Sequence, residues 1–355
     1  MKKSSTVGMT KMGAVVGLDL SDRKATYVIL NWRGRVVAEG SIALTRRGLE
    51  DRFAHATYRV ALEAGTHSPW VSRVLQQLGH EVLVANPRQL PLIFRSLRKD
   101  DRMDALSLAR LARFDPLLLR PITHRSEEAQ HHLALLRARD ALVASRTSLI
   151  SHVRGVVKSA GGRLPSCSAP SFARQAADLI PEPLAAALQP LLQTVAQLSD
   201  TISQYDREVE RLAAQHYPVT TALRQVNGVG PLTALAFVLT IEDPARFRTS
   251  RDVGAYVGLT PRRKDSGASH PQLHITKAGD AFLRRLLVQC AHYILGPFGQ
   301  DSELRRWGLK LAGSASKHGK KRAVTAVARR LAVLLHRLWT TGEVYVPLAI
   351  TRVAA

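Results

Sequence analysis

The sequence predicts a mixed α/β domain at its amino end, followed by a longer region that is almost entirely helical. Short apolar, β-rich segments alternate with helix patterns over roughly the first 115 residues. Heptad-spaced apolar residues take over from about residue 127. A third observation is the charge, because cations gather in the last part of the 355-residue chain. These patterns divide the chain into a short flexible lead (1–12), an α/β domain (13–120), a helical region (121–217) and a mostly helical carboxyl-terminal domain (218–355).

The α/β domain has a recognisable order of elements. The expected strands span residues 14–20, 26–30, 36–42, 58–63 and 81–85, and the expected helices span 44–56, 68–78 and 101–114. The sequence Asn31-Trp32-Arg33-Gly34 favours a hairpin turn between the second and third strands. Three strands, a helix, a strand, a helix, a strand and a helix is the order of a ribonuclease-H-like domain.

The helical region predicts a coiled coil. Its second half carries apolar residues at alternating spacings of three and four, which is the a/d pattern of a coiled-coil seam. The seam consists of Leu188, Leu191, Val195, Leu198, Ile202, Tyr205, Val209 and Leu212. Such a seam needs a partner helix, so we expect either oligomerisation or a hairpin within one chain, and the pattern does not choose between them.

The charge balance points to a polyanionic partner. The chain has 51 Lys and Arg against 28 Asp and Glu, a net charge of +23. About half of this excess lies between residues 261 and 337, which predicts a local nucleic-acid-binding surface because each neutralised phosphate releases counterions. The two cysteines, Cys167 and Cys290, are far apart, which argues against a disulfide framework and a zinc site. No apolar run approaches a membrane span, so we expect a cytoplasmic protein with no membrane partner, associated with the bacterial nucleoid.

Four carboxylates mark the α/β domain. Asp19 and Glu63 stand at the ends of apolar strands, and Asp101 and Asp104 start a helix three residues apart. In the ribonuclease-H arrangement the first strand, the fourth strand and the last helix converge at one edge of the sheet. Oxygen-only ligation is what Mg²⁺ prefers, so we expect these acids to form a Mg²⁺ site for phosphodiester chemistry. Asp100 is an alternative to Asp101, because Asp100 and Asp104 would also share a helix face.

Two features stand out in the carboxyl-terminal domain. Residues 223–233 read as a helix, a tight turn containing Gly228 and Gly230, and a second helix, which is a helix-hairpin-helix-like phosphate site. Further on, Ser266 precedes a glycine in a loop just after three cations, a position suited to an exposed nucleophile whose transition state is stabilised by positive charge. Other Ser-Gly loops are merely turns, and the nearby cations could equally only clamp phosphates. We expect nucleic-acid contacts from Arg262, Arg263, Lys264, Lys277, Arg284, Arg285, Lys320, Lys321 and Arg322.

Together these motifs resemble those of the transposases of insertion-sequence family 110, which are related to Piv-type DNA invertases. The resemblance rests on residues 17–19, 62–64 and 99–105 in the first domain, and on residues 227–231, 256–261, 266–267, 275–279 and 320–330 in the last. It implies a RuvC-like nuclease domain, a coiled coil and a transposase domain. It also implies an acidic tetrad of Asp19, Glu63, Asp101 and Asp104, with Asp100 in place of a small polar residue, and a nucleophilic Ser266.

The resemblance implies a reaction and partners as well. Ser266 would attack a phosphate of donor or target DNA with the help of Mg²⁺, in a homo-oligomer held by the coiled coil and guided by a structured bridge RNA. Ser269 is a rival nucleophile, and Asp265 directly before Ser266 departs from the family pattern. The alternatives are a DNA invertase with the same chemistry, a Holliday-junction-type nuclease that uses only the carboxylates, and a non-catalytic scaffold.

Overall fold

The structure of the protein is a computed structural model, which describes residues 13–87, 100–264, 266–267, 271, 273–313 and 317–348. The chain divides into two compact units, residues 1–125 and 126–355. Of the helical region predicted for residues 121–217, residues 126–217 lie in the second unit together with the carboxyl-terminal helices, and the first five residues belong to the first unit. A separate domain for that region stays a prediction. Within the described residues, no helix is long and apolar enough to cross a membrane.

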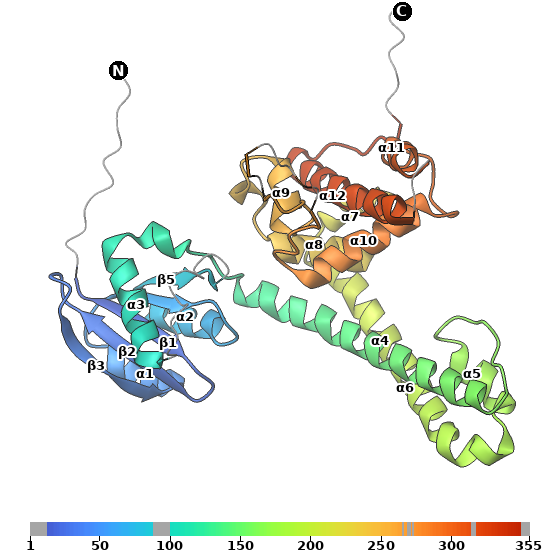
Figure 1. Cartoon of the computed structure of the whole chain (residues 1–355), viewed down its shortest axis with the longest axis horizontal. Coiled ribbons are helices and arrows are strands. Elements are labelled where there is room, and N and C mark those ends of the chain that lie inside the picture. The colour runs from blue at the N-terminus through green and yellow to red at the C-terminus, as the bar shows by residue number, and fades with distance from the viewer. Residues whose placement is uncertain are drawn as a thin grey trace, which may run out of the picture. The chain divides into compact units, whose positions relative to one another are not determined.

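The first unit is an α/β domain built on one five-stranded sheet (Figure 1). The strands lie in the order β3-β2-β1-β4-β5, with β1, β2 and β3 antiparallel and β1, β4 and β5 parallel. Their bounds are β1 Val15–Leu20, β2 Lys24–Leu30, β3 Val36–Ala43, β4 Arg59–Glu63 and β5 Glu81–Ala85; the helices are α1 Arg46–Phe53, α2 Ser68–Gln77 and α3 Asp101–Phe114, and a short 3-10 helix, η2, spans Pro116–Leu119. The predicted order of strands and helices is confirmed.

Opposite faces of strand β1 serve different helices. Val16 and Leu18 belong to the core that includes Phe53 of α1 and Leu75 of α2. Gly17 points to the other face, because side chains alternate along a strand. A β-carbon at Gly17 would overlap the backbone carbonyl of Ala105 in α3. Helix α3 therefore lies directly on β1, at a distance that only glycine permits.

The second unit begins with two long antiparallel helices, α4 (Glu127–Ser159) and α6 (Ala185–Gln215), which pack side by side (Figure 1). The short helix α5 (Phe172–Ala176) and the short 3-10 helices η3 (Ala177–Leu179) and η4 (Glu182–Leu184) occupy the connection between them. Every residue of the predicted seam in α6 is buried or half-buried. The seam packs on α4 of the same chain, so a contact between subunits through these helices would have to use their outer faces.

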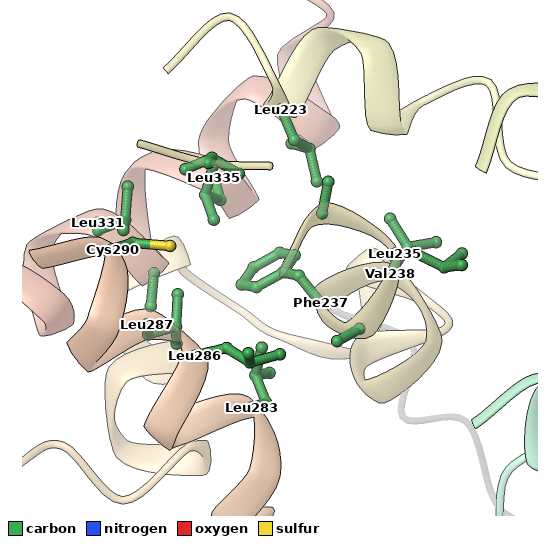
Figure 2. Close-up of a cluster of buried hydrophobic side chains, with 14 of the residues drawn as sticks. Leu223, Leu235, Phe237, Val238, Leu283, Leu286, Leu287, Cys290, Leu331 and Leu335 are labelled. Atoms are coloured by element: carbon green, nitrogen blue, oxygen red, sulfur yellow. The ribbon is translucent and has the colours of Figure 1, made fainter. Parts of the chain in front are cut away.

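The remaining helices enclose the largest apolar core. They are α7 Thr220–Leu223, α8 Pro231–Ile241, α9 Ser250–Tyr256, α10 Ala281–Leu295, α11 Glu303–Ala312 and α12 Lys317–Thr341, with the short 3-10 helix η5 at Pro244–Arg246. Phe237 of α8 is fully buried, and it lies in the same cluster as Leu287 of α10 and Leu335 of α12 (Figure 2). Cys290 is buried there as a free thiol, and burial raises its pKa above the ordinary value.

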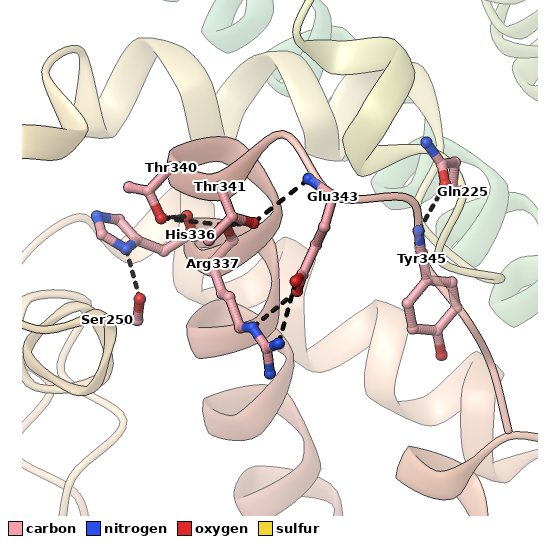
Figure 3. A network of polar contacts seen from close by, with 8 residues as sticks. All are labelled: Gln225, Ser250, His336, Arg337, Thr340, Thr341, Glu343 and Tyr345. Carbon is pink, nitrogen blue, oxygen red and sulfur yellow. Dashed lines mark hydrogen bonds and ion pairs between the residues drawn. The ribbon is translucent and has the colours of Figure 1, made fainter. Parts of the chain in front are cut away.

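Polar contacts fasten the end of α12 and the segment that follows it (Figure 3). The buried ring of His336 contacts the Ser250 hydroxyl through Nδ1 at 2.9 Å. Beyond the helix, Glu343 forms an ion pair with Arg337 at 2.7 Å. The backbone N–H of Tyr345 donates to the side-chain oxygen of Gln225 at 2.8 Å. Residues up to Pro347 are therefore tied to the helical core.

The contact at Gly17 gives a test of the first unit. We expect Gly17→Ala to lower the free energy of unfolding by at least ~1–3 kcal/mol, because the added methyl group meets backbone that cannot rotate away. Urea denaturation followed by circular dichroism measures this change. Gly155→Ala in α4 is the control, since open space surrounds that position and alanine should stabilise the helix by ~0.5–1 kcal/mol. Equal stability of Gly17→Ala and the unmodified chain would contradict the packing described here.

Candidate active-site carboxylates and the serine loop

Asp19 and Glu63 lie next to each other at the carboxyl edge of the sheet. Leu18 of β1 pairs in register with Leu62 of the parallel strand β4, so the following residues are neighbours about one strand spacing (~4.8 Å) apart. Both acids point to the face that α3 covers, because Asp19 is two residues after Gly17 and Glu63 is two residues after Ala61. Each is half-buried.

The first turn of α3 comes to the same edge. Ala105 and Ala109 lie over Gly17, whereas Ala112 packs with Val15 at the start of β1. Helix α3 therefore runs antiparallel to β1, and its first turn, with Asp101 and Asp104, lies near the end of the strand that bears Asp19. The structure thus brings all four predicted acids to one end of one face of the sheet.

Asp101 takes part in an ion pair that the sequence did not reveal. The Lys24 ammonium at the start of β2 is 3.2 Å from a carboxylate oxygen of Asp101, and both side chains are about half exposed. Lys24 faces this edge because β2 pairs antiparallel with β1, which sets Ala25 opposite Leu20. The pairing of Lys24 with Asp101 follows from the strand register, which the sequence alone does not give.

Asp100 has a different task from Asp101. Its carboxylate accepts a hydrogen bond from the backbone N–H of Arg102 at 3.0 Å and thereby caps the amino end of α3. Arg102 in turn forms an ion pair with Glu39 of β3 at 2.8 Å, and the hydrogen bonds that it donates to Glu39 raise the pKa of the Arg102 guanidinium. Asp100 therefore caps the helix, and the choice of Asp101 over Asp100 as a metal ligand stays a prediction.

The chemistry of these side chains fits a hard divalent cation, since all four offer carboxylate oxygens. In the part of the chain that the structure describes, however, these side chains do not form a set of metal ligands. Among the described residues, no three His, Cys, Asp or Glu side chains lie close enough together to hold a metal ion. The Mg²⁺ site therefore stays a prediction.

Ser266 lies in a loop, called here the serine loop, whose two ends are joined by backbone hydrogen bonds. The backbone N–H of Arg262 donates to the carbonyl of His274 at 2.9 Å, and the N–H of Thr276 donates to the carbonyl of Thr260 at 2.8 Å. Ser266 is exposed within the connection between these two segments. Asp265 and the rival Ser269 lie outside the described residues.

Two segments, one containing Gly258 and one containing Gly279, lie on either side of this loop and contact each other closely. Gly258 and Gly279 both have positive φ angles, +72° and +69°, and a β-carbon on either would overlap the backbone of the other motif. The Arg284 guanidinium donates to the carbonyl of Val257 at 3.0 Å and to that of Ala278 at 2.7 Å, so it ties the motifs together. These motifs build the base of the serine loop.

The cations predicted to bind nucleic acid fall into two groups. Three stand on the serine loop, one follows it and three stand near the start of α12, and all are exposed: Arg262, Arg263, Lys264, Lys277, Lys320, Lys321 and Arg322. Arg284 and Arg285 are already engaged within the protein, Arg284 with carbonyls and Arg285 with Asp140 at 2.6 Å. For all nine, binding to nucleic acid stays a prediction.

The turn that contains Gly228 and Gly230 lies between two helices of unequal length. Helix α7 has only four residues, and α8 starts at Pro231 with Gly230 as its N-cap. Gly228 has a φ of +90°, and its position is close to the Tyr293 ring of α10. The predicted helix-hairpin-helix is therefore not confirmed, although the backbone of Gly230 does begin a helix.

Comparison with known proteins gives the class. A DEDD transposase model of the IS110 group matches residues 16–161, and the model described as "Transposase IS116/IS110/IS902 family" matches residues 220–301. The chain is 29% identical over 292 residues to the transposase for insertion sequence element IS1328 of Yersinia enterocolitica, covering 81% of this chain and 85% of that protein. It is 29% identical over 294 residues to the IS1111A transposase of Coxiella burnetii, covering 81% and 79%.

A different kind of relative is the pilin gene-inverting protein of Moraxella bovis, which is 24% identical over 302 residues, covering 82% of this chain and 83% of that protein. The chain joins an α/β domain that carries acids to a helical domain, and both match transposase models. These matches define an enzyme that cleaves and transfers DNA. The chain belongs to the IS116/IS110/IS902 family of transposases.

The cap at Asp100 can be tested separately from catalysis. We expect Asp100→Ala to lower the stability of the first unit by ~0.5–2 kcal/mol, because the Arg102 N–H loses its acceptor. Asp100→Asn keeps an acceptor oxygen and should stay within a few tenths of a kcal/mol of the unmodified chain. Urea denaturation of both variants measures the difference. Identical losses in the two variants would argue against a capping role.

Proposed function

We propose that this transposase catalyses DNA strand exchange for an insertion sequence, with Ser266 as the nucleophile and Mg²⁺ held by Asp19, Glu63, Asp101 and Asp104. The observation that supports the proposal is that β1 and β4 run side by side up to Asp19 and Glu63, while the helix that begins with Asp101 and Asp104 packs on the same face. The exposed position of Ser266 among cations supports the second half of it.

The acidic residues have the chemistry to hold the metal. A bound Mg²⁺ would polarise a phosphate oxygen and stabilise the negative charge that develops during phosphodiester transfer. The protein's own contribution is to set the four carboxylates on rigid elements, two at strand ends and two on one helix turn. Lys24 balances part of their charge through its ion pair with Asp101.

The serine would act as a covalent carrier of one DNA end. Its Oγ attacks the phosphorus, the Oγ–P bond forms, and the P–O bond to the neighbouring deoxyribose breaks. The serine proton passes to a base or to water, and the departing DNA hydroxyl takes up a proton. Arg262, Arg263, Lys264 and Lys277 would stabilise the extra negative charge on the phosphate oxygens. Attack by another DNA hydroxyl on the phosphoserine reverses the bonds and completes the exchange.

The proposal includes partners. Donor and target DNA are the substrates, and the high positive charge suits them. A structured guide RNA and a homo-oligomer that completes the site are proposed from the family resemblance. Since the seam of α6 is buried against α4, subunits would meet through other surfaces.

A DNA invertase is the second candidate, favoured by the similarity to the pilin gene-inverting protein. It would use the same residues and the same covalent step. The two differ in whether the exchanged ends belong to one DNA segment that is flipped or to an element that moves.

The nucleophile is tested by trapping the covalent product. The full chain is incubated with Mg²⁺, the RNA encoded next to its gene and labelled donor DNA. We expect a denaturation-resistant protein–DNA band that falls by ~10³-fold or more in Ser266→Ala, because no other group forms the phosphoserine bond. Ser269→Ala is the matched control and should keep the band. Loss of the band in Ser269→Ala alone would reassign the nucleophile, and DNA cleavage without any band would identify a nuclease that uses only the carboxylates.

The acidic residues are tested by paired variants. We expect Asp101→Asn to slow strand exchange by ~10²-fold or more, because one carboxylate ligand of the metal is lost, whereas Asp100→Asn should keep the rate. Lys24→Gln removes the ion pair with Asp101 but keeps the Asp101 carboxylate, so it separates the metal role of Asp101 from its ion pair. An exposed pair of this kind contributes only ~0–1 kcal/mol to stability. The readout is the rate against Mg²⁺ concentration. An Asp101→Asn enzyme with the rate and Mg²⁺ dependence of the unmodified chain would overturn the assignment.

A further inference from the structure

The turn between β2 and β3 holds a tryptophan out in solvent. The side-chain oxygen of Asn31 accepts hydrogen bonds from the backbone N–H groups of Arg33 and Arg35, each at 3.0 Å. The N–H of Asn31 also donates to the carbonyl of Arg35 at 3.0 Å. Although these bonds order the turn, Trp32 within it is 63% exposed. The turn therefore holds a large aromatic ring in solvent, and tryptophan is a residue type enriched at interfaces.

Two arginine side chains contact Trp32, and a third arginine follows it in the turn. The Arg33 Cζ lies 4.6 Å from the centroid of the Trp32 ring, in cation–π contact. From α3, Arg113 donates to the backbone carbonyl of Trp32 at 3.5 Å and lies against Gly34. Arg35, whose carbonyl accepts the Asn31 N–H at the end of the turn, is exposed. Within the described part of the chain, none of these three arginines pairs with a carboxylate.

A second exposed aromatic ring follows Arg113. Phe114, the last residue of α3, is 79% exposed. The acids nearby are already occupied: Asp115 accepts from the N–H of Leu117 at 2.9 Å, and Glu81 pairs with Arg59 at 2.8 Å. The surface therefore combines aromatic rings with arginines that form no ion pair among the described residues.

We propose that this surface, the hairpin platform of Trp32, Arg33, Arg35, Arg113 and Phe114, binds unpaired nucleotides of a nucleic-acid strand. A base would stack on the indole, and the guanidinium groups would contact the adjoining phosphates. Stacking on aromatic rings beside arginines is the general means by which proteins hold single strands, and every base offers the flat face it requires. In a duplex those faces are covered, so the platform selects unpaired segments.

The hairpin platform is separate from the four acids. The turn follows the carboxyl end of β2, which runs antiparallel to β1, so it lies beside Val15 at the amino end of β1. Asp19 is at the opposite end of that strand. At ~3.3 Å per residue the two sites are roughly 15 Å apart, which is a few nucleotides of a single strand. One strand can therefore reach both sites, and the platform itself takes no part in bond breaking.

Crosslinking to the full-length protein tests the proposal. The probes are twelve-residue oligonucleotides that carry 5-iododeoxyuridine in oligodeoxythymidine or 5-iodouridine in oligouridine, and a duplex of the same DNA. We expect irradiation to attach the single strands to Trp32 or Phe114, identified by peptide mass spectrometry, with at least fivefold less attachment to the duplex. Preference for the DNA or the RNA probe identifies which strand the platform serves.

Matched variants separate stacking from other effects. Trp32→Ala should abolish the crosslink in the hairpin. It should also weaken single-strand binding by ~5- to 100-fold, measured at a salt concentration that suppresses phosphate binding by the cations of the carboxyl-terminal domain. Trp32→Phe should restore most of it. Phe298→Ala removes a comparably exposed aromatic ring, 77% exposed, and should change nothing.

Crosslinks that never include the platform, or a Trp32→Ala variant that alters only the oligomeric state in light scattering, would overturn the proposal. None of the three probes carries an element end, so the result is independent of the serine mechanism.

Discussion

The close contact between α3 and β1 is the constraint on which the candidate site depends. Gly17 lacks a side chain, so the backbone of Ala105 lies where a β-carbon would be. This contact fixes both the distance and the direction of the helix, and it carries Asp101 and Asp104 to the strand end that bears Asp19. A larger residue at position 17 would move the helix away from the sheet, and the acids of the strands and of the helix would separate.

Much of the α/β domain could be predicted from the sequence because its signals are local. Alternating apolar residues and turn residues located all five strands, and their order gave the expected arrangement. The contacts of the site were not predictable in the same way. The pair between Lys24 and Asp101 depends on strand register, and the pair between Arg102 and Glu39 joins residues 63 positions apart. Spacing alone left Asp100 and Asp101 equivalent, since both share a face with Asp104; the hydrogen bond at the helix start distinguishes them.

The helical region shows a similar limit. The three–four spacing in α6 correctly indicated a buried stripe, but a periodic pattern cannot say which helix covers it. In the structure the cover is α4, and a charged residue lies inside the contact: Arg146 is only 8% exposed and donates to Ser199 at 3.2 Å. Burial lowers the pKa of its guanidinium. A polar residue at such a place favours one alignment of two helices over shifted ones, because every other alignment leaves it without its acceptor.

The base of the serine loop has a consequence for how this family can vary. Both ends of the loop are anchored by backbone hydrogen bonds and by the interlocked Gly258 and Gly279, so the span between them is closed regardless of its contents. The entropic cost of closing a longer span grows only with the logarithm of its length, about 0.6 kcal/mol for each doubling. Insertions between the anchors should therefore be tolerated, and the segment that carries Ser266 can change in length while the surrounding helices keep their packing.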